Sequence, residues 1–315
     1  MWNVPAFQER YRQFEHALPR VGVDAPVAYT VSGTDLIPEG IAYDERESAL
    51  YMGSIARGEI IRIRNGKQDV FADRRAGLTN VLGLAIDTGN RRLYAVNTSA
   101  LTEAGGPARN EVVACDLQTG AVTGRFTAAQ ARQFNDVALS PEGICYVSDS
   151  AAGVVYRGRM AEPGDLEVLV KPGTFSGPNG LAVGDGVLFV AHTTGIARVD
   201  VESGAVTPLT NETREAVGAI DGLYFRDGAL FGIHNATNPG RVIRIELDAD
   251  RTKIINIRTL LSHHHPALNE PTTGAMAGDR FLVLANSYVA TLDEKGNIRD
   301  RSVLRDPVVL AVGVK

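Results

Sequence analysis

The chain of 315 residues has only two cysteines, Cys115 and Cys145. Two cysteines do not make a disulfide framework, so we expect two buried free thiols, with one bridge between neighbouring repeats as the alternative. No apolar run approaches the roughly 18 residues that a membrane-spanning helix needs. Lysine and arginine form no cluster, and the net charge of −5 is spread along the chain. This distribution argues against nucleic-acid binding.

Motifs of three common enzyme classes are absent as well. The chain has no nucleophile-elbow pattern GxSxG, no phosphate loop GxxxxGKS/T and no dinucleotide fingerprint GxGxxG. The N-terminal segment MWNVPAFQERYRQ is too charged for the apolar core of a signal peptide. The default location is therefore cytoplasmic, although removal of a signal peptide from a periplasmic or secreted precursor would leave the same sequence.

The residues that are present give an ordinary globular composition, with 44% hydrophobic residues and enough apolar surface for a sizeable core. Residues 3–18 are predicted to form a helix that Asn3 caps and that has Pro5 in its first turn. Its apolar residues follow helical spacing on one face: Phe7, Tyr11, Phe14 and Leu18. We expect this helix to cover one edge or face of the main body.

From residue 26 onward, short β-type segments separated by Gly, Asp, Asn and Pro turns indicate an all-β fold. One phrase, an apolar strand followed by a turn and a second apolar strand, recurs six times at intervals of 42 to 53 residues. The copies are PEGIAYDERESALYMGS from Pro38, VLGLAIDTGNRRLYAVN from Val81, FNDVALSPEGICYVSDS from Phe134, PNGLAVGDGVLFVAH from Pro178, IDGLYFRDGALFGIHN from Ile220 and TTGAMAGDRFLVLANS from Thr272.

A repeat of this length with about four strands is typical of a propeller blade, so six repeats predict a six-bladed β-propeller. A strand from the other end of the chain must complete the last blade, and PVAYTVSG at 26–33 is the natural candidate. We therefore predict one propeller domain at 26–315 after an N-terminal helical extension at 1–25. The longer intervals place insertions at 99–111 and 262–270, and such loops commonly shape a binding face.

The second residue of each phrase begins the innermost strand of its blade, so all six should meet at one mouth of the central channel. These residues are Glu39, Leu82, Asn135, Asn179, Asp221 and Thr273. Asn and Asp beside glycine are ordinary turn residues, which explains any one of them alone. Glu39 has no such turn preference, and four converging oxygen-bearing side chains suit a hard cation such as Ca²⁺ or Mg²⁺. No His or Cys occupies these positions, so a Zn²⁺ site of softer ligands is less favoured.

Polar residues at the ends of the second strands are candidates for a next layer of the channel. Asp149 and His192 are the best candidates for substrate contacts, although a single interior histidine is more often only hydrogen-bonded. The others are Ser54, Asn97, His234, Asn235 and Asn286. Three consecutive histidines, His263 to His265, cannot easily direct their imidazoles at one ion, so we expect a solvated loop there.

Four motifs, in their order and spacing, resemble those of one superfamily. They are PEG at 38–40, FND at 134–136, PNGLAV at 178–183 and IDGL at 220–223. With them, nearly the whole chain after the N-terminal helix resembles the gluconolactonase, senescence marker protein (regucalcin) and luciferin-regenerating enzyme superfamily, with paraoxonases as more distant relatives. The resemblance implies a divalent metal at the channel mouth with Glu39, Asn179 and Asp221 as its protein ligands.

The same resemblance implies further roles. Asn135 corresponds to a residue that contacts substrate or the outer sphere of the metal, and Asp221 to the carboxylate usually proposed as general base. The function implied is metal-dependent hydrolysis of lactones or related cyclic esters, with Ca²⁺ as the first choice of ion and Mg²⁺, Mn²⁺ or Zn²⁺ as alternatives. A Lewis acid beside a carboxylate that can deprotonate water would suit that reaction.

Two other interpretations stay open from the residues. One is a non-enzymatic ligand-binding or scaffold propeller that holds a structural ion. The other is a strictosidine-synthase-like enzyme, which shares the fold and works without metal. We expect a small-molecule substrate, and neither nucleic acid, membrane nor a protein partner.

Overall fold

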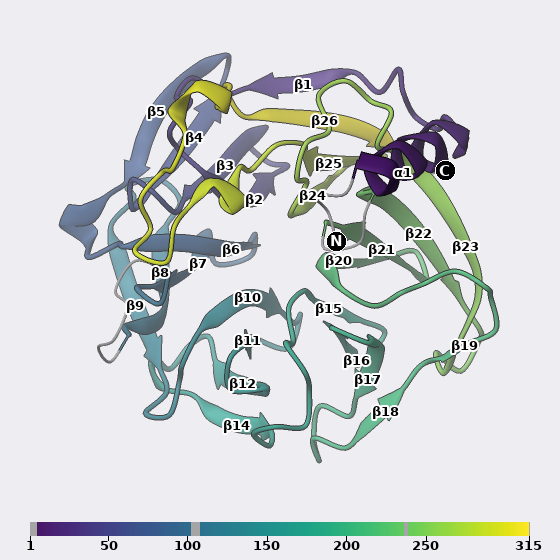
Figure 1. Ribbon diagram of the computed structural model, residues 1–315. Coiled ribbons are helices and arrows are strands. Elements are labelled where there is room, and N and C mark those ends of the chain that lie inside the picture. Colours follow the sequence, from purple (N-terminus) through teal and green to yellow (C-terminus); the bar gives the residue numbers. More distant parts are fainter. Residues whose placement is uncertain (1–4, 102–107, 236–238, 315) are drawn as a thin grey trace.

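Short apolar segments separated by turn residues pair into six sheets, antiparallel except for two short edge strands, that stand around one central axis (Figure 1). The computed structural model describes residues 5–101, 108–235 and 239–314. In each sheet the first strand of the repeated phrase lies beside the axis, and later strands lie toward the rim. The predicted six-bladed β-propeller is thereby confirmed.

The first three blades follow one another along the chain. Blade 1 contains β2 (Pro38–Asp44), β3 (Ala49–Ser54), β4 (Glu59–Arg64) and β5 (Lys67–Ala72). Blade 2 contains β6 (Asn80–Asp87), β7 (Arg92–Thr98), β8 (Asn110–Asp116), β9 (Val122–Thr127) and the short parallel strand β13 (Gly164–Asp165). Blade 3 contains β10 (Phe134–Leu139), β11 (Ile144–Asp149), β12 (Val154–Arg159) and β14 (Glu167–Val170).

The other three blades complete the ring. Blade 4 contains β15 (Leu181–Gly184), β16 (Val187–His192), β17 (Gly195–Val199) and β18 (Val206–Pro208). Blade 5 contains β20 (Ile220–Arg226), β21 (Ala229–His234), β22 (Arg241–Leu247), β23 (Lys253–Ser262) and the short parallel strand β19 (Thr210–Asn211). Blade 6 contains β24 (Gly274–Ala277), β25 (Arg280–Leu284), β26 (Val308–Gly313) and β1 (Val27–Thr30). Short 3₁₀ turns occupy Arg74–Ala76, Val289–Thr291 and Arg301–Val303.

The two ends of the propeller are joined in blade 6, as the sequence predicted. Strand β1 lies on the outer edge of β26 and pairs with it antiparallel, with Val27 opposite Leu310 (Figure 1). Because the first strand of the domain completes the last sheet, the ring closes through main-chain hydrogen bonds.

Apolar residues fill the spaces between neighbouring blades. In five blades an aromatic residue of the second strand packs toward the next blade: Tyr51, Tyr94, Tyr146, Phe189 and Phe231. In blade 6, Leu282 and Leu284 pack against the core of blade 1 instead. Every blade is thus covered on both faces, so the inner strands are held firmly at the axis.

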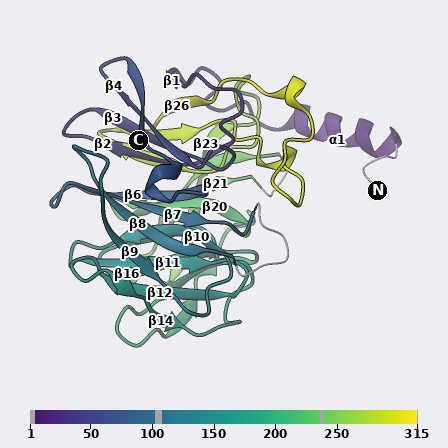
Figure 2. The same cartoon turned by 90° about the vertical axis from the view of Figure 1, so that its left-hand side faces the viewer.

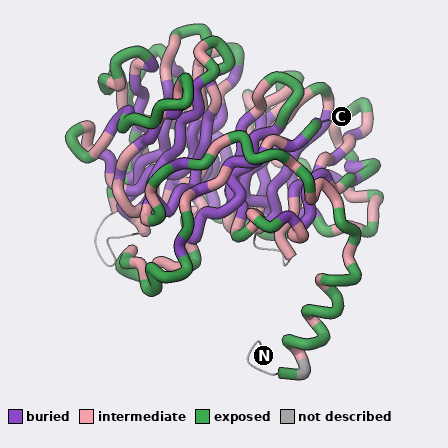
Figure 3. Tube along the Cα trace, turned by 90° about the horizontal axis from the view of Figure 1, so that it is seen from above, coloured by how far each residue is buried: buried purple, intermediate pink, exposed green. Residues whose placement is uncertain are grey.

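The N-terminal helix α1 (Pro5–Ala17) projects from the propeller (Figure 2; Figure 3). The prediction that it covers a face of the body is therefore wrong: 51% of Phe14 is exposed. Contact with the body is confined to the C-terminal end of the helix, where Phe14 and Leu18 line a cleft with Ile257 of β23. The predicted cap Asn3 lies outside the described residues.

The histidine tract does not form the solvated loop that we expected. His263 Nε2 lies 3.1 Å from the carbonyl oxygen of Glu15, and His265 Nε2 lies 3.0 Å from that of Ala25. The tract therefore fastens the N-terminal segment to blade 5. The sequence could not show this, because the partners are about 240 residues away.

The two cysteines are free and buried, in agreement with the expectation. Among the described residues, no helix is long and apolar enough to cross a membrane. Part of the predicted insertion at 99–111 lies outside the described residues.

Candidate active site at the channel mouth

A pairing irregularity marks the start of the inner strands. In blades 1, 2, 3 and 5 the register with the second strand shifts within the first residues of the phrase, as between Ile220 and Leu223. A β-bulge of this kind redirects a side chain out of the regular alternation. Glu39 and Asp221 lie in two of these bulges.

In blades 1, 2, 4 and 5 a glycine follows the mouth position, which is the second residue of each repeated phrase, and lets the inner strands touch. A Cβ atom on Gly40 would lie 2.0 Å from the carbonyl oxygen of Leu82, and one on Gly180 would lie 2.2 Å from that of Asp221. Only glycine fits where two backbones approach this closely. Neighbouring inner strands are therefore in direct contact, which brings side chains from different blades together.

Blade 6 corrects the sequence alignment by one residue. The amide of Leu284 donates to the Thr273 carbonyl, just as that of Ala191 donates to Gly180, the residue after the mouth position of blade 4. The mouth position of blade 6 is thus Thr272, not Thr273. Both threonine hydroxyls donate to the carbonyl oxygen of Glu39, so they hold blade 1 to blade 6.

Three carboxylates from three blades influence one another at the axis. Burial raises the pKa of Glu39 well above its ordinary range, and the charges of Asp221 and Asp136 raise it further. Burial also raises the pKa of Asp136 to about 7. For Asp221, burial and the charge of Asp136 raise the pKa to about 7, against hydrogen bonds from Asn179 and Asn235. The site therefore concentrates negative charge away from water.

Asp136 is the main residue that the sequence prediction missed. It occupies the position after Asn135, where blades 1, 2, 4 and 5 have glycine. Its Oδ2 accepts a hydrogen bond of 2.9 Å from the amide of Leu181 in the next blade. The replacement of a repeated glycine by aspartate in FND was the signal available in the sequence.

The phenol of Tyr224 is a second missed residue. Tyr224 lies on β20, and its oxygen accepts a hydrogen bond of 2.7 Å from the amide of Gly274 in blade 6. Burial raises its pKa well above the ordinary value, and the charges of Asp136, Glu39 and Asp221 add to the effect. The phenol therefore stays protonated beside the carboxylates.

Two oxygens of these carboxylates have no protein partner. Glu39 Oε2 and Asp221 Oδ1 are buried and accept no hydrogen bond from the described residues. The other oxygen of Asp221, Oδ2, accepts a hydrogen bond from the side-chain amide of Asn235. Buried oxygens of this kind are costly unless something positive or hydrogen-donating occupies the space in front of them.

Two of the strand-end residues, Asp149 and Asn97, have structural positions instead of lining the channel. Asp149 is fully buried, and its carboxylate accepts hydrogen bonds from the backbone amides of Arg132, Gln133 and Ala152 at 2.7, 3.1 and 2.9 Å. This corrects the prediction that Asp149 contacts substrate, because its oxygens anchor the segment that leads into β10. Asn97 plays the same part in blade 2 by accepting from the Thr79 amide at 2.7 Å.

His192 and Asn135 stay accessible. His192 is half-buried, with its ring 5.2 Å from that of Phe175, and burial lowers the pKa of its imidazole. Asn135 is half-buried in the bulge of β10. Their predicted contact with substrate is compatible with these positions and stays a prediction.

The donor set suits a hard cation only if amide oxygens take part. Among the residues that the structure describes, no three Asp, Glu, His or Cys side chains form a ready-made metal cluster. Glu39 and Asp221 nevertheless offer buried oxygens without partners, and Asn179 approaches Asp221. Carboxylate and amide oxygens are the ligands that Ca²⁺ accepts. The residues thus fit such an ion, with Asn179 as a neutral ligand.

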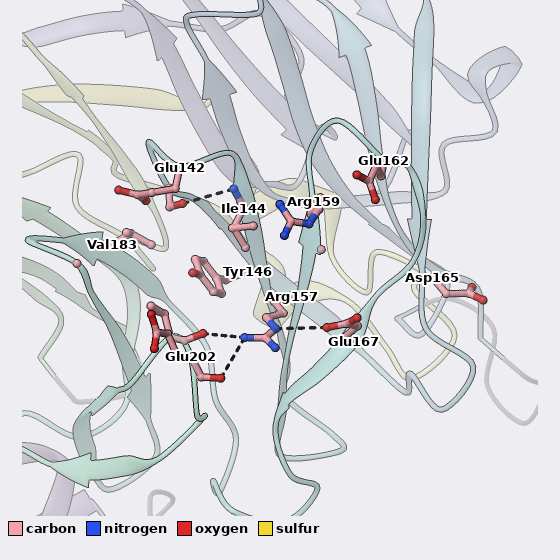
Figure 4. Close-up of a pocket in the computed structure, with 14 residues that line it drawn as sticks. Glu142, Ile144, Tyr146, Arg157, Arg159, Glu162, Asp165, Glu167, Val183 and Glu202 are labelled. Atoms are coloured by element: carbon pink, nitrogen blue, oxygen red, sulfur yellow. Dashed lines mark hydrogen bonds and ion pairs between the residues drawn. The ribbon is translucent and has the colours of Figure 1, made fainter.

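The cleft shown in Figure 4 lies away from this site. It has a volume of about 480 Å³ and lies between blades 3 and 4, lined by Glu142, Tyr146 and Arg157 among others. The guanidinium of Arg157 donates to the carbonyl oxygens of Val201 and Glu202 and fixes one wall. None of the channel-mouth residues contributes to this cleft.

Fold and site together define a six-bladed β-propeller with an acidic channel mouth. No profile of a known protein family matches the chain, and a comparison with curated proteins finds no match. Many solved structures do share the fold. One is a gluconolactonase from Xanthomonas campestris, with 16% identity over 91% of this chain and 97% of that one, and a TM-score of 0.58.

Two other similar structures are enzymes of different names. A luciferin-regenerating enzyme is 15% identical over 91% of this chain and 92% of its own, with a TM-score of 0.58. A PQQ-bound aldose sugar dehydrogenase from Streptomyces coelicolor is 17% identical over 92% and 97%, with a TM-score of 0.60. Two of the three family names expected from the sequence, gluconolactonase and luciferin-regenerating enzyme, thus recur among these structures. At such identities the likeness shows the shared fold and leaves the reaction to be argued from the site.

Proposed function

We propose that this chain is a metal-dependent hydrolase of lactones or related cyclic esters, as in gluconolactonase-like propellers. The observation that carries the proposal is the pair of buried, partnerless oxygens on Glu39 and Asp221, which come from different blades, and the charge of Asp221 raises the pKa of Glu39. A scaffold role would not require such a costly arrangement. Glu39, Asn179 and Asp221 are the proposed ligands of one divalent cation, with Ca²⁺ first and Mg²⁺, Mn²⁺ or Zn²⁺ as alternatives.

When bound, such a cation would polarise the ester carbonyl and stabilise negative charge on its oxygen. The chain's own residues supply the rest. Asp221 has a free Oδ1 that can accept a proton from a water molecule, while its Oδ2 is held by Asn235. Asn135 and His192 are the proposed substrate contacts. Asp136 adds negative charge that favours both cation binding and a basic Asp221.

The proposal is tested by elemental analysis of the purified chain, followed by lactone hydrolysis with D-glucono-δ-lactone and an apolar δ-lactone. Hydrolysis should be lost after EDTA treatment and return with one of the four cations. Asp221→Asn should bind the cation but lose most of the turnover, and Asn179→Ala should weaken cation binding more than folding. Glu202→Gln, in the cleft of Figure 4, is the matched control and should behave as wild type.

The absence of any divalent ion, together with no lactone turnover on adding each cation, would overturn the enzyme proposal. Full cation-dependent turnover in Asp221→Asn would remove the general-base role alone. We also propose that the substrate is a small molecule, and that the location is the cytoplasm, or the periplasm or exterior if a signal peptide precedes this chain.

A further inference from the structure

We infer that Asn235 is a positioning residue: it holds the carboxylate of Asp221 so that Oδ1 faces the cation, and it thereby sets the affinity of the site. The inference rests on the proposed function, because it concerns the same cation. Asn235 is not one of the proposed ligands, and it acts only through Asp221.

The geometry around Asp221 shows one oxygen held and the other left free. Asn235 directly follows β21, and its Nδ2 donates a hydrogen bond to Asp221 Oδ2. Asp221 Oδ1 is buried and has no partner among the described residues. A donor on one oxygen fixes the plane of a carboxylate, so the other oxygen keeps one direction.

The other blades show that this hydrogen bond is not a general feature of the fold. At the position of Asn235, Thr98 donates to the Asn110 side chain, Ser150 to the Pro178 carbonyl and Asn286 to the Asp306 carbonyl. These bonds hold local segments. Among the described residues, the side chain at the position of Asn235 bonds to the mouth residue of its own blade in blade 5 alone.

The backbone before Asp221 is also held in a defined conformation. Ala219, two residues before it, has a left-handed φ of 57°, a conformation that costs a non-glycine residue free energy. Gly177 occupies the same conformation before Asn179, with φ of 55°. The chain thus enters these two mouth positions along one fixed path, and Asn235 fixes the remaining freedom of the Asp221 side chain.

The test is calorimetric titration of the EDTA-treated full chain with CaCl₂ and with MnCl₂. Asn235→Ala and Asn235→Leu should bind 10- to 100-fold more weakly than wild type, the usual effect of removing a partner of a metal ligand. The matched control is Asn256→Leu on β23, which breaks an exposed Asn–carboxylate bond of 3.3 Å to Glu246 and should leave the affinity unchanged. Thermal unfolding in EDTA reports folding separately, and the rise in unfolding temperature on adding CaCl₂ should shrink only in the Asn235 variants.

Cation binding in both Asn235 variants at wild-type affinity would overturn the inference, with the proposed function untouched. If the wild-type chain binds none of the four proposed cations in the same titration, the proposed function fails and the inference fails with it. If the wild-type chain binds a cation but hydrolyses no lactone, the reaction is refuted while the titrations still decide the role of Asn235. Should Asn235→Leu not fold, Asn235→Ala alone decides, because it adds no bulk.

Discussion

Replacing Asp136 by asparagine should change how the stability of the cation-free protein depends on pH. The pKa of the Asp136 carboxyl is raised from 3.8 to about 7. Because the folded pKa lies above the unfolded one, the stability from this group is present at low pH and is lost as the pH rises from about 4 to 7. Three pKa units correspond to about 4 kcal/mol, an upper limit because part of Asp136 is exposed.

The asparagine side chain avoids this loss but gives up one acceptor oxygen. In the wild-type chain the carboxylate accepts from the backbone amides of Leu181 and Val137. The single side-chain oxygen of asparagine can accept from only one of these amides, and leaving the other without an acceptor costs about 1–3 kcal/mol of stability. Between pH 5 and pH 8, Asp136→Asn should therefore gain about 2–3 kcal/mol of stability relative to wild type, and at pH 8 it should be the more stable of the two.

The assay is urea unfolding in EDTA at pH 5, 6, 7 and 8. Asp250→Asn, an exposed aspartate whose replacement changes the net charge equally, is the matched control. The free-energy difference between Asp136→Asn and wild type is the decisive quantity, since other titrating groups largely cancel in it. A difference that stays constant from pH 5 to pH 8 would refute the reasoning about the buried carboxylates.

Three further measurements test other parts of the structure. Ala219→Gly should stabilise the protein by about 0.5–1 kcal/mol in urea, since glycine adopts the left-handed conformation without strain, and Gly177→Ala should destabilise it by a similar amount. Asp149→Ala should lower the free energy of unfolding by about 2–4 kcal/mol, because the amides of Arg132 and Gln133 lose their acceptor. The calcium affinity of the folded protein should stay unchanged. Weaker calcium binding would show that Asp149 contributes to the site after all. Burial lowers the pKa of His234 from 6.5 to about 4, and the positive charge of Arg241 adds to the effect. The stability that depends on the neutral imidazole is complete above pH 6.5 and falls by up to about 3 kcal/mol toward pH 4. The free energy of unfolding of His234→Gln should therefore depend less on pH between 6.5 and 4 than that of wild type. An unchanged pH dependence in this range would contradict the prediction.

Much of the fold was readable because its signals are local. Alternating apolar residues and turn glycines define each strand pair, and their recurrence along the chain identified six blades and the closing strand β1. The helix was recognised for the same reason, since 3.6-residue spacing is a property of a short segment. Its packing was not, because an amphipathic pattern does not say which surface the apolar face meets.

The candidate site was only partly readable. Glu39, Asn179 and Asp221 stood out because their side chains differ at one repeated position. Asp136 was missed because it follows that position instead of occupying it. Thr273 was assigned to the mouth position in place of Thr272 because the sixth phrase has two consecutive threonines before its glycine. Asp149 looked like a channel residue until its hydrogen bonds to Arg132 and Gln133 showed an anchoring role.

The sequence by itself determined the repeat, the number of blades and which side chains differ among them, since each of these depends only on residues that are close together in the sequence. Only the tertiary structure decided which oxygens are left without a partner, that Asn235 holds Asp221, and that the charge of Asp136 raises the pKa values of Glu39 and Asp221. The physical reason is that hydrogen bonding and charge interaction depend on distances between residues that lie far apart in the sequence. Those distances are fixed by the close backbone contacts of the inner strands around the axis.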